Sequence, residues 1–178
     1  DRNTPGNLPG LDVFDAPEFP WRGLMLDSAR HMQSVGFIKR YLDWMSLHKL
    51  NVFHWHLTDD QAWRLEIKAW PKLAKVGGYR VPAGAAPAAD IDPETGKPRL
   101  YGGYYSQEDV IEIVRHATAR HITVVPEIDV PGHATAAIAA YPELGVDGFK
   151  VESVSADWGI FDNVFNLGES TFEFLETV

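Results

Sequence analysis

The sequence of 178 residues contains no cysteine. This absence excludes a disulfide framework, a thiolate-bound zinc site and a cysteine nucleophile. It leaves the cellular compartment open, because a chain of this length can bury a core without disulfides. Long apolar runs are missing as well. No stretch approaches the roughly 20 apolar residues of a membrane-spanning helix, and no basic segment followed by an apolar one opens the chain. We therefore expect no membrane partner.

Positive charge is also scarce. The 16 Lys and Arg residues are outnumbered by 25 Asp and Glu residues, which gives a formal net charge of −9. Scattered cations on an acidic chain argue against a nucleic-acid partner. Aromatic residues, in contrast, are plentiful, with six Trp, nine Phe and six Tyr. Some of these rings are expected in the core, but surfaces that bind sugars also use aromatic faces.

The order of elements predicts an α/β fold. Residues 1–20 are rich in Pro, Gly and Asp and are predicted to be an opening loop or a linker, so that residues 21–178 form the domain. Strands are predicted at 22–27, 52–57, 123–129 and 164–166, and helices at 34–48, 106–121, just after Pro131 and from 171 onward. Residues 77–104 are predicted to be a long insertion or lid. Strands that alternate with helices at this spacing indicate parallel β/α units.

Ionisable residues fall late on one face of each long predicted strand. Alternate residues of a strand share a face, which groups Asp27 with His54, His56, Glu127 and Asp129. Pro126 cannot donate to a ladder, so we expect it near the end of its strand. The loops beyond the strands add four more polar residues: Arg30, Asp59, Asp60 and His133. Active sites of parallel α/β folds lie at this carboxyl-terminal rim.

Three functions are compatible with these residues. A metal-dependent hydrolase would use His54 and His56 as ligands, although His-x-His is a weak signal. A glycoside hydrolase would use carboxylates for proton transfer, with aromatic rings and arginine holding the sugar. A sugar-binding half barrel without catalysis is the third. Plain structural roles are open too, since Arg30 could simply pair with Asp27 and the late carboxylates could cap loops.

Four blocks of the sequence resemble a known family. They are WRGLMLDSAR at 21–30, NVFHWHLTDDQAWR at 51–64, YGGYY at 101–105 and PEIDVPGHA at 126–134. In this order they resemble the family 20 glycoside hydrolases, the β-N-acetylhexosaminidases. The resemblance implies a (β/α)8 TIM barrel, of which this chain would be the N-terminal half, roughly the first four β/α units.

The resemblance implies an exo-acting enzyme whose substrate is a glycan ending in β-linked N-acetylglucosamine or N-acetylgalactosamine. Hydrolysis would retain configuration through substrate assistance, in which the 2-acetamido group attacks the anomeric carbon. It implies no metal and no other cofactor. An extracytoplasmic location is favoured by the resemblance alone.

The resemblance also implies roles for particular residues. Arg30 would bind the outer hydroxyls of the sugar, and His56 and Glu127 would line the pocket. Asp59 and His133 match the family's carboxylate–imidazole pair, which tunes the catalytic acid. Asp60 is adjacent to Asp59 and could exchange roles with it; otherwise it belongs to the substrate-binding set.

One expected feature is absent. The family's catalytic Asp-Glu pair belongs to a Gly-Gly-Asp-Glu type segment, and no Asp-Glu dipeptide occurs in this sequence. We therefore expect that this chain is part of a larger enzyme and is inactive alone. Half a barrel leaves two sheet edges open, so we also expect it to associate with the remaining half or with itself.

Overall fold

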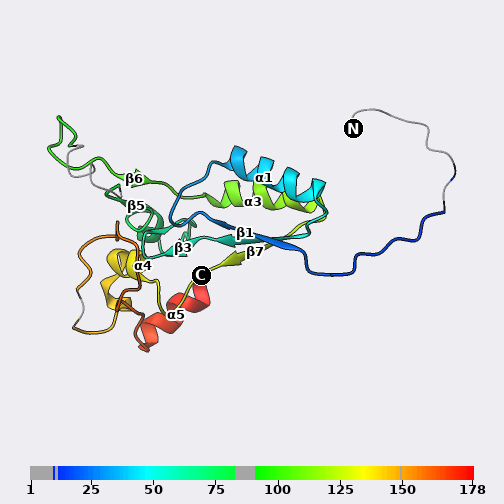
Figure 1. The fold of residues 1–178 in the computed structure, drawn as a ribbon. Helices are drawn as coiled ribbons and strands as arrows, with labels where there is room; N and C mark the ends of the chain where they lie inside the picture. Colours follow the sequence, from blue (N-terminus) through cyan, green and yellow to red (C-terminus); the bar gives the residue numbers. More distant parts are fainter. Residues whose placement is uncertain (1–9, 11, 83–90, 149) are drawn as a thin grey trace.

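A three-stranded parallel sheet lies at the centre of the fold (Figure 1). The computed structural model describes residues 10, 12–82, 91–148 and 150–178. The strands are β1 (Gly23–Asp27), β2 (Val52–His56) and β7 (Thr123–Glu127), in the order β1-β2-β7. Their register places the last residues of the three strands, Asp27, His56 and Glu127, side by side. The parallel β/α architecture predicted from the sequence is therefore present.

Two helices of similar length, which run parallel to each other, cover one side of the sheet (Figure 1). Helix α1 spans Val35–Leu47 and α3 spans Gln107–Thr118, and the hydroxyls of Ser34 and Ser106 cap their first turns. Their apolar sides bury Ile38, Leu42, Met45, Ile113 and Ala117 against Phe53 and Trp55. None of the helices in the described ranges is long and apolar enough to cross a membrane.

Helix α3 ends three residues before the predicted end at His121. The backbone of His121 is left-handed, with φ of 57°, and the N–H of Ile122 bonds to the carbonyl of Ala117. This turn redirects the chain from the helix into β7. The predicted start of the helix is confirmed, because Ser106 and Asp109 form a reciprocal capping box.

A second cluster of elements packs on the carboxyl-terminal side of the strands. It contains β3 (Thr58–Asp59), β4 (Ala62–Trp63), α2 (Lys72–Lys75), α4 (Thr135–Ala140), a 3₁₀ helix (Pro142–Leu144) and α5 (Glu169–Thr177). At the centre of this cluster, the ring of Phe174 meets the rings of Trp63 and Phe165 edge to face. The predicted helices after Pro131 and near the end of the chain correspond to α4 and α5.

The predicted strand at 164–166 is wrong. Phe165 makes only an isolated antiparallel bridge with Gly145. The side-chain amide of Asn166 donates to the carbonyls of Glu143 and Gly145, which ties this segment to the 3₁₀ helix. Within the residues that the structure describes, the parallel sheet therefore has three strands, with β1 and β7 as its edges.

Strand β7 ends at Glu127, two residues before the predicted end, and Pro126 lies inside it, level with Trp55. The N–H of Thr123 points toward β2 and donates to Asn51. Because backbone N–H groups alternate along a strand, the nitrogen of Pro126 falls on the opposite side, away from β2. The proline therefore leaves the β2–β7 ladder intact.

The described residues of the predicted insertion, 77–82 and 91–104, belong to an arm that projects from the fold (Figure 1). Its base is the antiparallel pair β5 (Tyr79–Arg80) and β6 (Tyr101–Gly102). At Gly102, φ is +156° and an added Cβ would lie 2.1 Å from the carbonyl oxygen of Gly78, so glycine is required there. Residues 83–90 lie outside the described ranges, and a lid function stays a prediction.

Most of the predicted opening segment 1–20 also falls outside the described residues or is irregular. Residues 10 and 12–20 contain no helix or strand, and the Phe14 side chain is fully exposed. The division between residues 1–20 and 21–178 stays a prediction.

Candidate active site

Arg30 lies at the centre of the polar cluster beyond the strand ends. Its Nη2 is 2.7 Å from Asp59 Oδ2, its Nη1 is 3.0 Å from Asp27 Oδ2 and its Nε donates to Gln61 Oε1 at 2.8 Å. Asp27 also accepts the backbone N–H of Arg30 through Oδ1, so this carboxylate both shapes the turn after β1 and pairs with the guanidinium. The Asp59 side chain is almost fully buried, so the ion pair is shielded from water.

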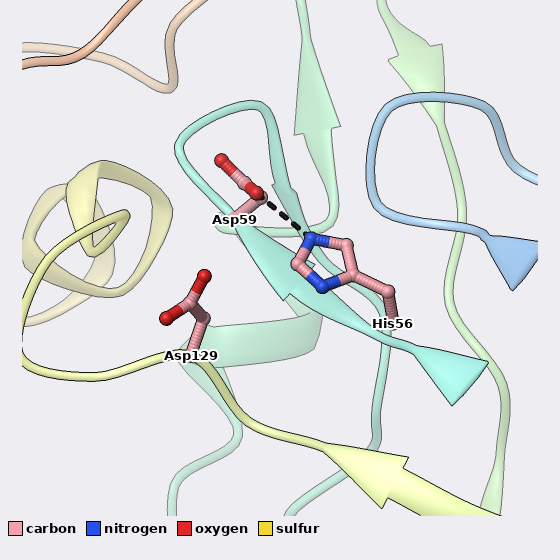
Figure 2. Close-up of side chains that lie close together, drawn as sticks. All are labelled: His56, Asp59 and Asp129. Carbon is pink, nitrogen blue, oxygen red and sulfur yellow. Dashed lines mark hydrogen bonds and ion pairs between the residues drawn. The ribbon is translucent and has the colours of Figure 1, made fainter. Parts of the chain in front are cut away.

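His56 stands between two carboxylates. Its Nε2 lies 2.8 Å from Asp59 Oδ2. Its Nδ1 lies 3.0 Å from Glu127 Oε1, but the angle of this contact does not make it a hydrogen bond. Burial lowers the pKa of His56, but the Asp59 and Glu127 carboxylates outweigh burial and raise it above its usual value. Figure 2 shows the His56 ring from β2 facing Asp59, with Asp129 from the segment after β7 beside them.

Asp129 was expected on the strand but lies just beyond it. Its backbone N–H donates to Thr58 Oγ1 at 2.9 Å, which fixes the turn after β7. Burial raises the pKa of the Asp129 carboxyl, and the nearby carboxylates of Glu127 and Asp59 add to this effect. The turn therefore brings a further acid to the rim.

His133 contacts both adjacent aspartates. Its Nδ1 is 2.8 Å from Asp60 Oδ2 and 3.0 Å from Asp59 Oδ1. Asp60 also accepts hydrogen bonds from the hydroxyl and the backbone N–H of Thr135 at the start of α4. The two carboxylates thus have different partners, Arg30 and His56 for Asp59 and Thr135 for Asp60. Their division of roles stays a prediction, because the imidazole bridges them.

These contacts predict how the site responds to pH. Burial lowers the pKa of His133, but the hydrogen bond to Asp60 and the charges of Asp59 and Asp60 outweigh it and raise the pKa above 6.5. A raised histidine pKa stabilises the fold fully below pH 6.5, and that contribution is lost as the pH rises through the folded-state pKa. For Asp59, burial raises the pKa, but His56, Asp60 N–H and Arg30 lower it overall. The contribution of Asp59 to the stability of the fold is therefore lost as the pH falls below 3.8.

We therefore expect the His133 ring to titrate above pH 6.5 in an NMR titration of the protein that carries this domain. Substitution of Asp60→Asn removes one negative partner and lowers that midpoint. The exposed Asp147→Asn is the control and leaves it unchanged. A midpoint below 6.5 in the unsubstituted protein, or one insensitive to Asp60→Asn, contradicts the assignment.

No group of potential metal ligands in the described part of the chain contains both His54 and His56. His54 Nε2 contacts one oxygen of Glu127, and His56 lies against the other. The described part of the chain contains two groups of potential metal ligands whose ligand atoms lie within 4.8 Å of one another. They are His56 with Asp59 and Asp129, and Asp59 with Asp60 and His133. His54 belongs to neither group. Asp59 is common to both, and the Arg30 guanidinium already neutralises it.

Sequence patterns missed three contributors to the site. Arg64 is fully buried and donates to the carbonyls of four residues: Ser28, Ala29, Gly78 and Gly103. Burial lowers the pKa of Arg64 to about 10. Gln61 links Arg30 to the carbonyl of Asp157, and the ring of Trp158 lies over the Arg30 guanidinium. Of these three residues, only Arg64 had a signal in the sequence: it is a charged residue within the apolar segment AWRL, residues 62–65.

Parallel β/α units with ionisable side chains gathered at the carboxyl ends of the strands are typical of α/β enzymes, a class that includes the (β/α)8 barrels. The family model "Glycosyl hydrolase family 20, catalytic domain" matches residues 19–178. The chain belongs to this family, as the sequence motifs imply.

Relatives and solved structures agree with this assignment. A beta-hexosaminidase of Porphyromonas gingivalis is 44% identical over 98% of this chain, and one of Vibrio furnissii is 40% identical over 96% of it. A crystal structure of a beta-N-acetylhexosaminidase covers 92% of the chain with 34% identity and a TM-score of 0.81. A Vibrio harveyi family 20 exo beta-N-acetylglucosaminidase in complex with N-acetylglucosamine gives a TM-score of 0.72, with 39% identity over 92% of the chain.

The chain spans only part of these proteins. It covers 21% and 28% of the two hexosaminidases, and 33% and 25% of the two structures. The structural neighbours have TIM-barrel catalytic domains, and this chain is an α/β portion of one.

Proposed function

We propose that this domain belongs to a retaining exo-β-N-acetylhexosaminidase that works by substrate assistance. It would supply residues that bind the substrate and residues that adjust the pKa of the catalytic acid. The observation that carries the proposal is the anchoring of Arg30 by Asp27, Asp59 and Gln61 at the carboxyl ends of the strands. We interpret these contacts as holding the arginine in place to receive a neutral sugar.

Arg30 would bind the outer hydroxyls of the terminal sugar. A guanidinium carries five N–H donors in a rigid fork. Among the described residues Nη2 donates to Asp59 alone, which leaves an N–H of Nη2 for a sugar hydroxyl. Because three acceptors hold the fork in place before substrate arrives, little side-chain entropy is lost on binding. His56, which contacts both Asp59 and Glu127, would help to hold the Asp59 carboxylate in position for Arg30.

The histidine–aspartate assembly would tune the catalytic acid. His133 bridges Asp59 and Asp60, and both carboxylates favour the imidazolium. A histidine held by carboxylates can position a neighbouring glutamic acid and adjust its pKa. That glutamate would protonate the leaving oxygen and then activate water, while its neighbouring aspartate would hold the acetamido group. The 178 residues contain no Asp-Glu pair, so the remaining units of the barrel would supply both groups.

Exposed apolar surfaces support a partner for this chain. Strands β1 and β7 are edges, and Leu24 and Met25 on β1 are over 40% exposed. An open apolar cavity of about 680 Å³ runs between α3 and β7, lined in part by Val110, Val114 and Val124. We propose that the remaining β/α units of the barrel cover these surfaces, or that two copies of the chain do so when those units are absent.

The proposal is tested with an aryl N-acetyl-β-glucosaminide. The enzyme that contains this domain together with the remaining barrel units releases the aryl alcohol, and a chelator leaves the rate unchanged. The purified 178-residue chain gives no turnover. Loss of activity with chelator, restored by a divalent metal, would favour the metal-dependent alternative. Clear turnover by the chain alone would contradict the proposed division of catalytic groups.

A further inference from the structure

Trp158 is an exposed aromatic residue at the edge of the polar cluster. The centre of its ring lies 5.7 Å from Arg30 Cζ and 6.2 Å from the centre of the His31 ring. Yet 64% of the residue remains exposed. Single exposed apolar side chains are common on protein surfaces. This one differs because it lies over the arginine at the centre of the site.

The segment that carries Trp158 is tied to the same residues that hold Arg30. Gln61 accepts from Arg30 Nε at 2.8 Å through Oε1 and donates through Nε2 to the Asp157 carbonyl at 2.7 Å. The backbone N–H of Ser155 donates to the carbonyl of Asp60 at 3.3 Å. One buried amide therefore connects the orientation of the guanidinium to the position of the tryptophan.

From these contacts we infer that Trp158 is a further substrate-contact residue, whose ring packs against the apolar face of the sugar that Arg30 holds. This inference rests on the proposed function. A pyranose presents hydroxyls around its edge and C–H groups on its faces. A donor fork suits the edge, and an aromatic face suits the C–H surface. Arg30 contacts one side of the indole, and the exposed remainder is free for a ligand.

A purely structural role for Trp158 predicts different kinetics. The indole could act by shielding the Arg30–Asp59 ion pair from water, since a cation over an indole face is stabilised electrostatically. Its removal would then act through Arg30 and lower kcat or thermal stability. A ring that contacts the sugar in both the ground state and the transition state changes KM with little effect on kcat.

The test uses the enzyme that contains this domain and the remaining barrel units. Substitution of Trp158→Ala is expected to raise KM for an aryl N-acetyl-β-glucosaminide by about 5- to 20-fold. It leaves kcat within about threefold and the melting temperature unchanged. Trp158→Phe keeps an aromatic face and stays within about threefold of wild type in KM. Trp44→Ala is the matched control, because Trp44 is a similarly exposed tryptophan, 52% exposed, on α1.

Each outcome decides the inference. An unchanged KM in an active Trp158→Ala enzyme overturns it, and so does a fall in kcat or melting temperature at constant KM. If the alanine variant does not fold, Trp158→Leu keeps apolar bulk without the π face and makes the same comparison. A wild-type enzyme without turnover contradicts the proposed function itself, whereas an active wild type with an unaffected KM in the variants contradicts only the role of Trp158.

Discussion

Replacing Arg64 by methionine is expected to lower the free energy of unfolding by about 4 kcal/mol. The Arg64 side chain is fully buried and donates to the carbonyls of Ser28, Ala29, Gly78 and Gly103 at 2.7–2.9 Å. Methionine fills most of the volume but donates nothing. Four carbonyl oxygens would then lose a charged donor in a place that water does not reach, and each unmet acceptor carries a cost.

Chemical denaturation of the protein that carries this domain measures the effect. Arg40→Met is the control, because Arg40 is exposed on α1, and it is expected to change stability by less than about 0.5 kcal/mol. Arg64→Lys should fall between the two, since an ammonium cannot reach four carbonyls that a planar fork spans. A loss below about 1 kcal/mol for Arg64→Met would contradict the view that this arginine holds the loops of the site together.

Replacing Arg30 by alanine is expected to lower kcat/KM for an aryl N-acetyl-β-glucosaminide by about 100-fold or more. The substitution removes the proposed donor to the sugar hydroxyls. It also leaves the Asp59 carboxylate buried without its cation, which lies 2.7 Å away in the intact site. Both effects act on the same reaction, because Asp59 also orients His56 and His133.

The measurement is steady-state kinetics of the complete enzyme, with and without chelator. Arg30→Lys keeps the charge near Asp59 but loses the fork, so it separates the electrostatic effect from sugar binding. We expect Arg30→Lys to recover only part of kcat/KM. Full activity in Arg30→Ala would rule out a role for this residue in binding the substrate.

The geometry of the strand ends could be predicted from alternation alone. Asp27, His56 and Glu127 fall late on one face of their strands, and the register places them level. The cap of α1 and the capping box of α3 have a fixed sequence spacing, because the hydroxyls of Ser34 and Ser106 accept backbone N–H groups three positions further on. Such local rules have a fixed sequence spacing, and they predicted the elements that position the site.

Contacts between distant segments could not be predicted in this way. Arg64 binds main-chain carbonyls, which every residue possesses, so no pattern of side chains marks its partners. The link from Gln61 to the carbonyl of Asp157 spans 96 residues for the same reason. The run at 164–166 was too short to separate a strand from an irregular segment, and the side chain of Asn166 decides its path.

The base of the projecting arm separates the length of the arm from the geometry of the site. Arg64 binds the carbonyls of Gly78 and Gly103, and β5 pairs with β6 just beyond them. The chain is thus closed into a loop at its base, independently of what lies between residues 81 and 100. Loop-closure entropy grows only slowly with length. Insertions and deletions in the arm can therefore accumulate during evolution without disturbing Arg30, whereas the two glycine-rich ends are constrained in length and composition.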